Sequence, residues 1–192
     1  MTNPRSSTEV LEEGRERPSF RHLFDTEFSY VWNALRRLGV READVLDQTQ
    51  EVFLIVHSLL PDYDATRPVR PWLFAIAYRI ACRYRALARH RFEVPEEPEH
   101  EQMDSRPNAD EQLESGQARE LMLEAIQEIE LSRRAVFIMS EIEEQPMADI
   151  ATALQIPVNT AYSRLRLARD DFEKAAARLL ARRASGARGK GA

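Results

Sequence analysis

The stretch QIPVNTAYSRLRLARDDF, residues 155–172, decides how the C-terminal part of this chain is expected to fold. Its apolar residues recur at the period of a helix that buries one stripe. The preceding segment PMADIATAL, residues 146–154, predicts a shorter helix that starts at Pro146, and Gln155 and Ile156 form the turn between the two. Two helices joined by so short a turn match a helix-turn-helix. The buried stripe of the second helix would consist of Ala161, Leu165, Ala168 and Phe172.

The outward side of the second helix carries residue types that read DNA. Asparagine, tyrosine and arginine side chains can bond base edges in the major groove, and arginine also holds phosphate. Gln155 occupies a turn position that favours a positive φ, at a cost of about 1 kcal/mol for a residue other than glycine. A plain helical hairpin would show a similar pattern. The candidate DNA-reading residues are Val158, Asn159, Tyr162, Ser163, Arg164 and Arg166.

The net charge of −5 conceals a strong segregation of charge along the chain. Residues 65–91 contain seven arginines and no carboxylate, and residues 155–192 have an excess of six positive charges. Residues 93–117, which lie between them, carry nine carboxylates and one arginine. A solvated surface would explain one basic block by itself. Two blocks rich in arginine favour contact with nucleic acid, because arginine can hold phosphate through two parallel hydrogen bonds.

The rest of the chain is also predicted to be helical. Helical spacing of apolar residues begins after Ser19 and ends at Gly39, then resumes over residues 41–60 and again from Trp72. The sequence contains no alternating strand pattern and no tandem repeat. The expected fold class is therefore all-α, with two small helical domains joined by a flexible acidic linker, the C-terminal one a helix-turn-helix. The expected segments are a disordered tail over 1–18, a helical domain over 19–92, the linker over 93–117, the helix-turn-helix domain over 118–183 and a disordered tail over 184–192.

Several functional classes find no support in the sequence. The single cysteine, Cys82, leaves no internal disulfide or CxxC metal site, so we expect no metal and a reducing cytoplasm. The four histidines are scattered and form no coherent site with carboxylates, so we expect no catalytic residue, no cofactor and no enzyme. No apolar run reaches the ~20 residues of a membrane span, and residues 1–18 lack the apolar core of a signal peptide. We therefore expect a cytoplasmic protein with no membrane insertion.

Three segments, taken in this order, resemble the extracytoplasmic-function sigma factors, small sigma-70 family subunits of bacterial RNA polymerase. DVLDQTQEVFLIVHSLLPDYD, residues 44–64, resembles their polymerase-binding helix. RPWLFAIAYRIACRYRA, residues 70–86, resembles their promoter-melting helix. EEQPMADIATALQIPVNTAYSRLRLARDDF, residues 143–172, resembles their C-terminal helix-turn-helix. The resemblance implies that the chain binds core RNA polymerase and promoter DNA, and that an anti-sigma factor controls it.

The resemblance also implies roles for particular residues. The arginines at 79 and 83 stand where asparagine or aspartate is common in the family, and the tyrosine at 162 replaces a usual lysine. The helix over 155–172 would bind the −35 element through the residues given above. The expected polymerase contacts are Asp44, Asp47, Gln50 and Glu51, and the expected contacts to the −10 element are Tyr63, Arg67, Arg70, Phe74, Arg79 and Arg83.

A different class of protein would use part of the same pattern. A helix-turn-helix repressor or activator that binds DNA without polymerase explains residues 145–172. It gives no reason for the first arginine block or for the acidic patch on the helix over 41–60. The resemblance to sigma factors accounts for all three features.

Overall fold

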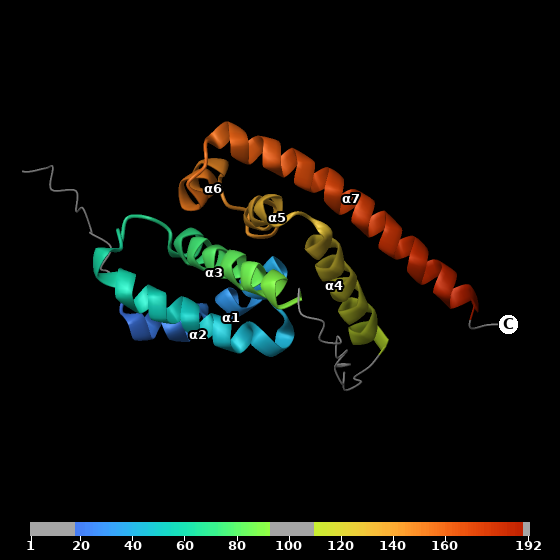
Figure 1. The fold of residues 1–192 in the computed structure, drawn as a ribbon, viewed down its shortest axis with the longest axis horizontal. Helices are drawn as coiled ribbons and strands as arrows, with labels where there is room; N and C mark the ends of the chain where they lie inside the picture. The colour runs from blue at the N-terminus through green and yellow to red at the C-terminus, as the bar shows by residue number, and fades with distance from the viewer. Residues whose placement is uncertain (1–17, 93–109, 190–192) are drawn as a thin grey trace, which may run out of the picture.

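The computed structural model describes residues 18–92 and 110–189, and within these ranges it shows only helices and turns (Figure 1). The predicted all-α fold class is confirmed. No helix in the described ranges is long and apolar enough to cross a bilayer. The elements are α1 (Phe20–Leu38), α2 (Glu42–Leu59), the 3₁₀ turn η1 (Leu60–Asp62), α3 (Val69–Phe92), α4 (Asp110–Glu128), α5 (Leu131–Phe137), the π-helical turn η2 (Ile138–Ile142), α6 (Met147–Leu154) and α7 (Val158–Gly189).

The N-terminal unit consists of α1, α2 and α3, and α1 begins and ends where the sequence predicts. The side-chain oxygen of Ser19 accepts a 3.2 Å hydrogen bond from the backbone N–H of His22, which caps the first turn. Gly39 ends the helix with a φ of 95° and donates its N–H to the carbonyl of Arg36 at 3.0 Å. Large buried side chains of this unit are Val31, Leu35, Leu38, Val45, Leu73, Phe74 and Ile76.

The two C-terminal helices α6 and α7 meet at the tight turn that the sequence predicts. Gln155 has a φ of 55°, as expected for this position, and its N–H donates to the carbonyl of Thr152 at 3.2 Å. The N–H of Ile156 donates to the carbonyl of Ala151 at 3.0 Å, which closes the turn. Pro146 precedes α6 as its cap, so the helix begins at Met147, one residue later than predicted. The predicted stripe is confirmed, since Ala161, Leu165 and Ala168 are buried and Phe172 is half-buried.

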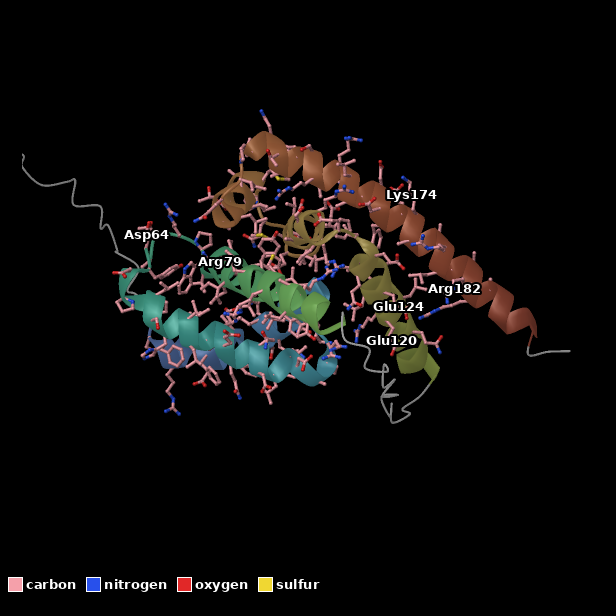
Figure 2. The ribbon with its side chains drawn as sticks, viewed as in Figure 1. Asp64, Arg79, Glu120, Glu124, Lys174 and Arg182 are labelled. Atoms are coloured by element: carbon pink, nitrogen blue, oxygen red, sulfur yellow. The ribbon has the colours of Figure 1, made fainter. Side chains whose placement is uncertain are left out.

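The helix α7 is longer than predicted, because it continues past the turn region and pairs with α4. Ala175 and Leu179 prolong its apolar stripe and pack against Ala125 of α4. An ion pair of 2.9 Å joins Arg178 to Glu128. Figure 2 shows Glu120 and Glu124 along α4, and Lys174 and Arg182 along α7. Residues 110–117 and 184–189, which were predicted as linker and tail, are helical. Residues 1–17, 93–109 and 190–192, where the rest of the linker and tails was predicted, lie outside the described residues.

The two halves of the molecule pack side by side and share one continuous apolar core. α3 lies against α6, and α1 contacts α4 and α5 (Figure 1). The core runs from Leu35 in α1 and Phe74 in α3 to Ile138 in η2 and Ile150 in α6. The sequence predicts two tethered domains and contains no signal for this contact, because the residues that make it belong to the apolar stripes of separate helices.

A buried arginine crosses the contact between the halves. The guanidinium of Arg134, only 2% exposed, donates to the carbonyl of Leu38 at 2.9 Å, to that of Ile129 at 2.8 and 3.1 Å, and to that of Gln127. Burial and the nearby Arg85 lower its pKa to about 10. Arg134 thus ties the end of α1 to the start of α5 through backbone carbonyls.

Candidate nucleic-acid interface

The first candidate surface is formed by arginines of α3 and of the loop that precedes it. Arg79 and Arg83 are exposed on α3, while Arg67 lies in the loop and Arg70 in the first turn of the helix. Three of the four already have a carboxylate partner within the chain. Arg67 pairs with Asp64 at 3.3 Å, Arg70 pairs with Glu27 at 3.0 Å, and Arg83 pairs with Glu51. Among the described residues, Arg79 has no carboxylate within ion-pair distance.

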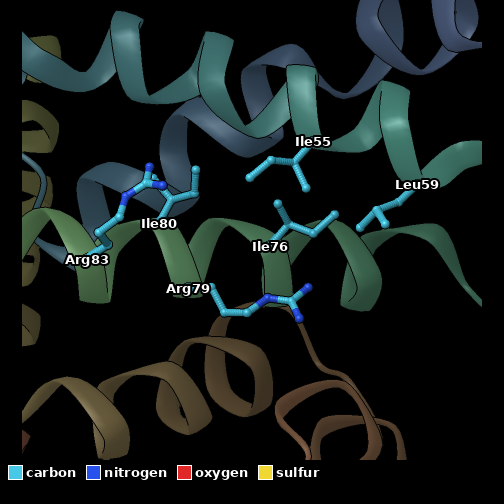
Figure 3. Close-up of a pocket in the computed structure, with 6 residues that line it drawn as sticks. All are labelled: Ile55, Leu59, Ile76, Arg79, Ile80 and Arg83. Carbon is cyan, nitrogen blue, oxygen red and sulfur yellow. The ribbon is translucent and has the colours of Figure 1, made fainter.

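A groove between α2 and α3 lies under these arginines and was not predicted from the sequence. Its volume is about 280 Å³. Ile55 and Leu59 of α2 and Ile76 and Ile80 of α3 line it, with Arg79 and Arg83 on its α3 side (Figure 3). Arg83 extends toward α2 in this view (Figure 3). An apolar surface beside guanidinium groups can hold an unstacked base and its phosphates. Ile76 and Ile80 are also buried in the core of the N-terminal unit, as their helical spacing predicts, so Ile55 and Leu59 form the accessible apolar part of the groove.

The aromatic residues predicted for the same surface lie deeper than the arginines. Tyr63 is buried, its ring 4.5 Å from that of Trp72, and its hydroxyl donates to the carbonyl of Arg67 at 2.5 Å. Tyr63 therefore holds the shape of the loop over residues 63–68. Phe74 is 0% exposed and belongs to the core of the N-terminal unit, so the prediction of a direct DNA contact does not fit its position.

The four residues of α2 that are predicted to contact polymerase differ in their exposure and their partners. Asp47 and Gln50 are exposed. Asp44 is half-buried and accepts hydrogen bonds from the hydroxyl of Tyr84 at 2.5 Å and from Arg41 at 3.0 Å. Burial, together with the hydrogen bond to Asp44, raises the pKa of Tyr84. Glu51, on the side of α2 toward α3, is the partner of Arg83.

The second candidate surface is the first two turns of α7. Val158 and Tyr162 are exposed, and the side chain of Tyr162 is 58% accessible. Val158 and Tyr162 are four residues apart, so their side chains are neighbours on one side of the helix. Asn159, Ser163 and Arg166 are exposed as well, as the sequence predicts. These five residues form a continuous outward face.

Arg164 differs from its neighbours because it is half-buried. Its charge acts on Tyr78 of α3, where it opposes a rise in the tyrosine pKa. Burial and the hydrogen bond with Cys82 raise the pKa of Tyr78 to about 12. The charge of Arg164 is therefore close enough to α3 to act on Tyr78.

A polar cluster at the contact between the halves reaches Arg70. The hydroxyl of Tyr30 lies 2.6 Å from Oε2 of Glu143, and the guanidinium of Arg70 lies 5.1 Å from the centre of the Tyr30 ring. Burial raises the pKa of Glu143, although the hydrogen bond from Tyr30 and the charges of Arg37 and Arg70 oppose this rise. The cluster places one arginine of the first surface at the edge of the contact between the halves.

Comparisons with known proteins agree with the division into two units. Two family models match the chain: Sigma-70 region 2 over residues 23–91, and Sigma-70, region 4, over residues 119–171. The curated RNA polymerase sigma factor NccH of Alcaligenes xylosoxydans xylosoxydans is 25% identical over 139 residues, which cover 71% of this chain and 75% of that protein. The two matched regions contain the arginine surface of α3 and the outward face of α7.

Solved structures share the fold. The structure of CnrH in complex with the cytosolic domain of CnrY has a TM-score of 0.56 and 22% identity, over 81% of this chain and 85% of that one. The sigma factor RpoE in complex with the anti-sigma factor NepR from Bartonella quintana has a TM-score of 0.55 and 18% identity, over 79% and 95%. The two family matches together span more than half of the chain and show that it belongs to the sigma-70 family, as an extracytoplasmic-function sigma factor.

Proposed function

We propose that this sigma factor binds core RNA polymerase through α2, opens the −10 element with α3 and reads the −35 element with α7. The observation that carries the proposal is the presence of two exposed surfaces with arginines, one in each half, within the regions that match sigma-70 regions 2 and 4. Joint action on one promoter requires both surfaces. The cytoplasm, where RNA polymerase works, is the proposed location.

The polymerase contact is assigned to the acidic side of α2. Asp47 and Gln50 are exposed and available to a partner, and Glu51 is partly exposed. Asp44 holds Tyr84 and Arg41, so it supports the position of α3 relative to α2 in addition to any contact with polymerase. Carboxylates on one helix face complement a basic surface and steer the encounter.

The −10 contact is assigned to the arginines around the groove between α2 and α3. Arg79 and Arg83 would hold the backbone of the non-template strand, with Arg67 and Arg70 at the loop end. An unstacked base would lie against Ile55 and Leu59, the more exposed apolar residues of the groove, because Ile76 and Ile80 are buried. The hydrogen bond from the Tyr63 hydroxyl to the carbonyl of Arg67 supports the loop.

The −35 contact is assigned to the outward face of α7. Asn159, Tyr162 and Arg166 have the donors and acceptors needed for base edges, while Val158 can contact a thymine methyl group and Ser163 a phosphate. Arg164 is half-buried beside this face and can contribute a further contact to phosphate.

A protein of the anti-sigma class is the proposed regulator. Both solved structures that share the fold are complexes, one with the cytosolic domain of CnrY and one with the anti-sigma factor NepR. Two arginine surfaces in one compact molecule can be covered by a single partner, which would prevent contact with DNA.

The experiment that tests this function compares two bindings. The purified chain is mixed with core RNA polymerase, and separately with promoter duplex in the absence of polymerase. Co-elution with core polymerase, together with weak binding to duplex alone, supports the proposal. Tight sequence-specific binding to duplex by the free chain, without affinity for core polymerase, would identify a repressor or activator instead.

A further inference from the structure

Glu51 and Arg83 join the two surfaces that the proposed function assigns to different partners. Glu51 belongs to the acidic side of α2, and Arg83 belongs to the arginine surface of α3. An ion pair links Nη2 of Arg83 to Oε1 of Glu51, and their side chains are 51% and 36% exposed. Both groups are therefore accessible to a partner from outside, and each is neutralised by the other until a partner arrives.

The other arginines of the surface do not have this arrangement. Arg67 pairs with Asp64 in its own loop, and Arg70 pairs with Glu27 of α1. Arg79 has no carboxylate partner among the residues that the structure describes. Within the described ranges, the pair of Arg83 with Glu51 is thus the one ion pair that connects the −10 arginines to the acidic side of α2.

A carboxylate engaged by a cation of another protein cannot keep its full interaction with Arg83. If the Glu51 carboxylate pairs with a cation of the polymerase, the guanidinium of Arg83 loses its anion. A DNA phosphate can then take the place of the carboxylate at the edge of the groove. Conversely, a phosphate on Arg83 would free Glu51. Such coupling between two sites is reciprocal by thermodynamic necessity.

We propose that the ion pair between Glu51 and Arg83 couples the two bindings, so that core polymerase increases the affinity of the −10 surface for single-stranded DNA. This inference rests on the proposed function. In the free chain the pair reduces DNA affinity, and in the holoenzyme Arg83 is released. The pair is exposed, so the expected effect of removing it is about two- to fivefold in affinity.

The first test uses the free chain and fluorescein-labelled oligothymidylate, with binding followed by anisotropy. Glu51→Gln should bind the oligonucleotide about two- to fivefold more tightly than the wild type. Glu42→Gln is the matched control, because it lies on the same helix, removes the same charge and breaks a comparable ion pair, that with Arg36 at 2.7 Å. An equal gain in oligonucleotide affinity in the two variants would show that the change in net charge causes the effect, and would overturn the coupling.

A double variant isolates the pair from the rest of the surface. In the Arg83→Gln background, Glu51→Gln should give no more gain than the Glu42→Gln control, because the cation that it releases is no longer there. An undiminished gain would show that Glu51 acts on another group. Circular dichroism melting curves of all variants confirm that the helices remain folded.

The reciprocal test measures affinity for core RNA polymerase without DNA. Arg83→Gln should raise that affinity about two- to fivefold because Glu51 is released, whereas Arg178→Gln, which breaks the pair with Glu128 of α4, should leave it unchanged. Unchanged affinity of Arg83→Gln would overturn the coupling. A wild-type chain that fails to bind core polymerase would overturn the proposed function itself, and the oligonucleotide test on the free chain distinguishes the two failures.

Discussion

Tyr30 and Glu143, far apart in the sequence, meet at the contact between the halves, where the tyrosine hydroxyl lies 2.6 Å from the glutamate Oε2. The other oxygen of Glu143 is buried without a hydrogen-bond partner, as is Nη1 of Arg85. Arg85 also lies close enough to the buried Arg134 to lower the pKa of that guanidinium. Partly satisfied charged groups of this kind cost free energy, so the contact is suited to open.

The substitution Tyr30→Phe tests how far this hydrogen bond holds the halves together. Loss of the hydroxyl leaves the Glu143 carboxylate buried with neither oxygen bonded to a donor, at an expected cost of about 1–3 kcal/mol in the free energy of unfolding. Urea denaturation measures the change. Tyr162→Phe removes a hydroxyl from an exposed tyrosine and should have almost no effect. Equal stability of the two variants would show that the hydrogen bond contributes nothing.

The raised pKa of Glu143 predicts a dependence of stability on pH. Folding favours the protonated carboxyl, so this group stabilises the folded chain at low pH and loses that contribution as pH rises from the ordinary value of 4.5 through the raised pKa. Glu143→Gln mimics the protonated form and abolishes the titration. The stability of this variant relative to the wild type should therefore increase with pH across that window, in denaturation curves recorded at several pH values. A difference independent of pH would contradict the assignment.

Gly39 is expected to tolerate no side chain. Its φ of 95° disfavours other residues, and a Cβ would lie 2.6 Å from Nη1 of Arg134. Gly39→Ala should lower the free energy of unfolding by about 1–3 kcal/mol. Gly116→Ala is the matched control, because the same methyl group meets nothing within 4 Å on the helix α4 and should stabilise by up to about 1 kcal/mol. Thermal denaturation would contradict this account if both substitutions changed stability in the same direction.

The amphipathic helices and their ends were predictable from the sequence, and the contact between the halves was not. Ser19 and Gly39 are strong local signals for the ends of α1, and the spacing from Ala161 to Ala168 identifies the buried face of α7. From the sequence alone, Arg134 would be assigned to the solvent-exposed surface. Its partners in the structure are backbone carbonyls, one of them in the other half, and no sequence motif marks them.

In the candidate site, too, the features that depend on one helix were predictable from the sequence, and those that depend on the packing of two helices were not. The outward residues of α7 follow directly from helical period, since Asn159, Tyr162 and Arg166 lie opposite the buried stripe. The burial of Phe74 and the ion pair of Arg83 with Glu51 depend on how α3 lies against α2. Helical period alone cannot fix the rotation and crossing of two helices.

A charge reversal on α2 tests the polymerase contact. Asp47→Arg should abolish binding to core polymerase without loss of helix content, because Asp47 is exposed and forms no ion pair with the residues that the structure describes. Co-purification with core polymerase measures the effect. Glu173→Arg makes the same charge change on an exposed position of α7 and should still co-purify. Retention of Asp47→Arg on the polymerase would remove Asp47 from the interface.

The outward face of α7 is tested by its effect on sequence preference. Alanine at both Tyr162 and Arg166 should weaken binding of the holoenzyme to its −35 element by about 1–3 kcal/mol for each base that these side chains recognise. Arg182→Ala changes an exposed arginine farther along the same helix and should leave the preference intact. Competition with mutated −35 sequences measures the preference. Equal weakening on every sequence would assign the two residues to phosphate.

The proposed function requires that the arginine surface of α3 and the outward face of α7 act together on one promoter when the chain is bound to core RNA polymerase. In vitro transcription with core polymerase and a library of genomic promoter fragments tests it most directly. We expect transcripts that start at defined positions, share a −10 and a −35 element, and depend on the chain. A chain that supports no specific initiation with its cognate core enzyme, yet binds a DNA site tightly by itself, would contradict it.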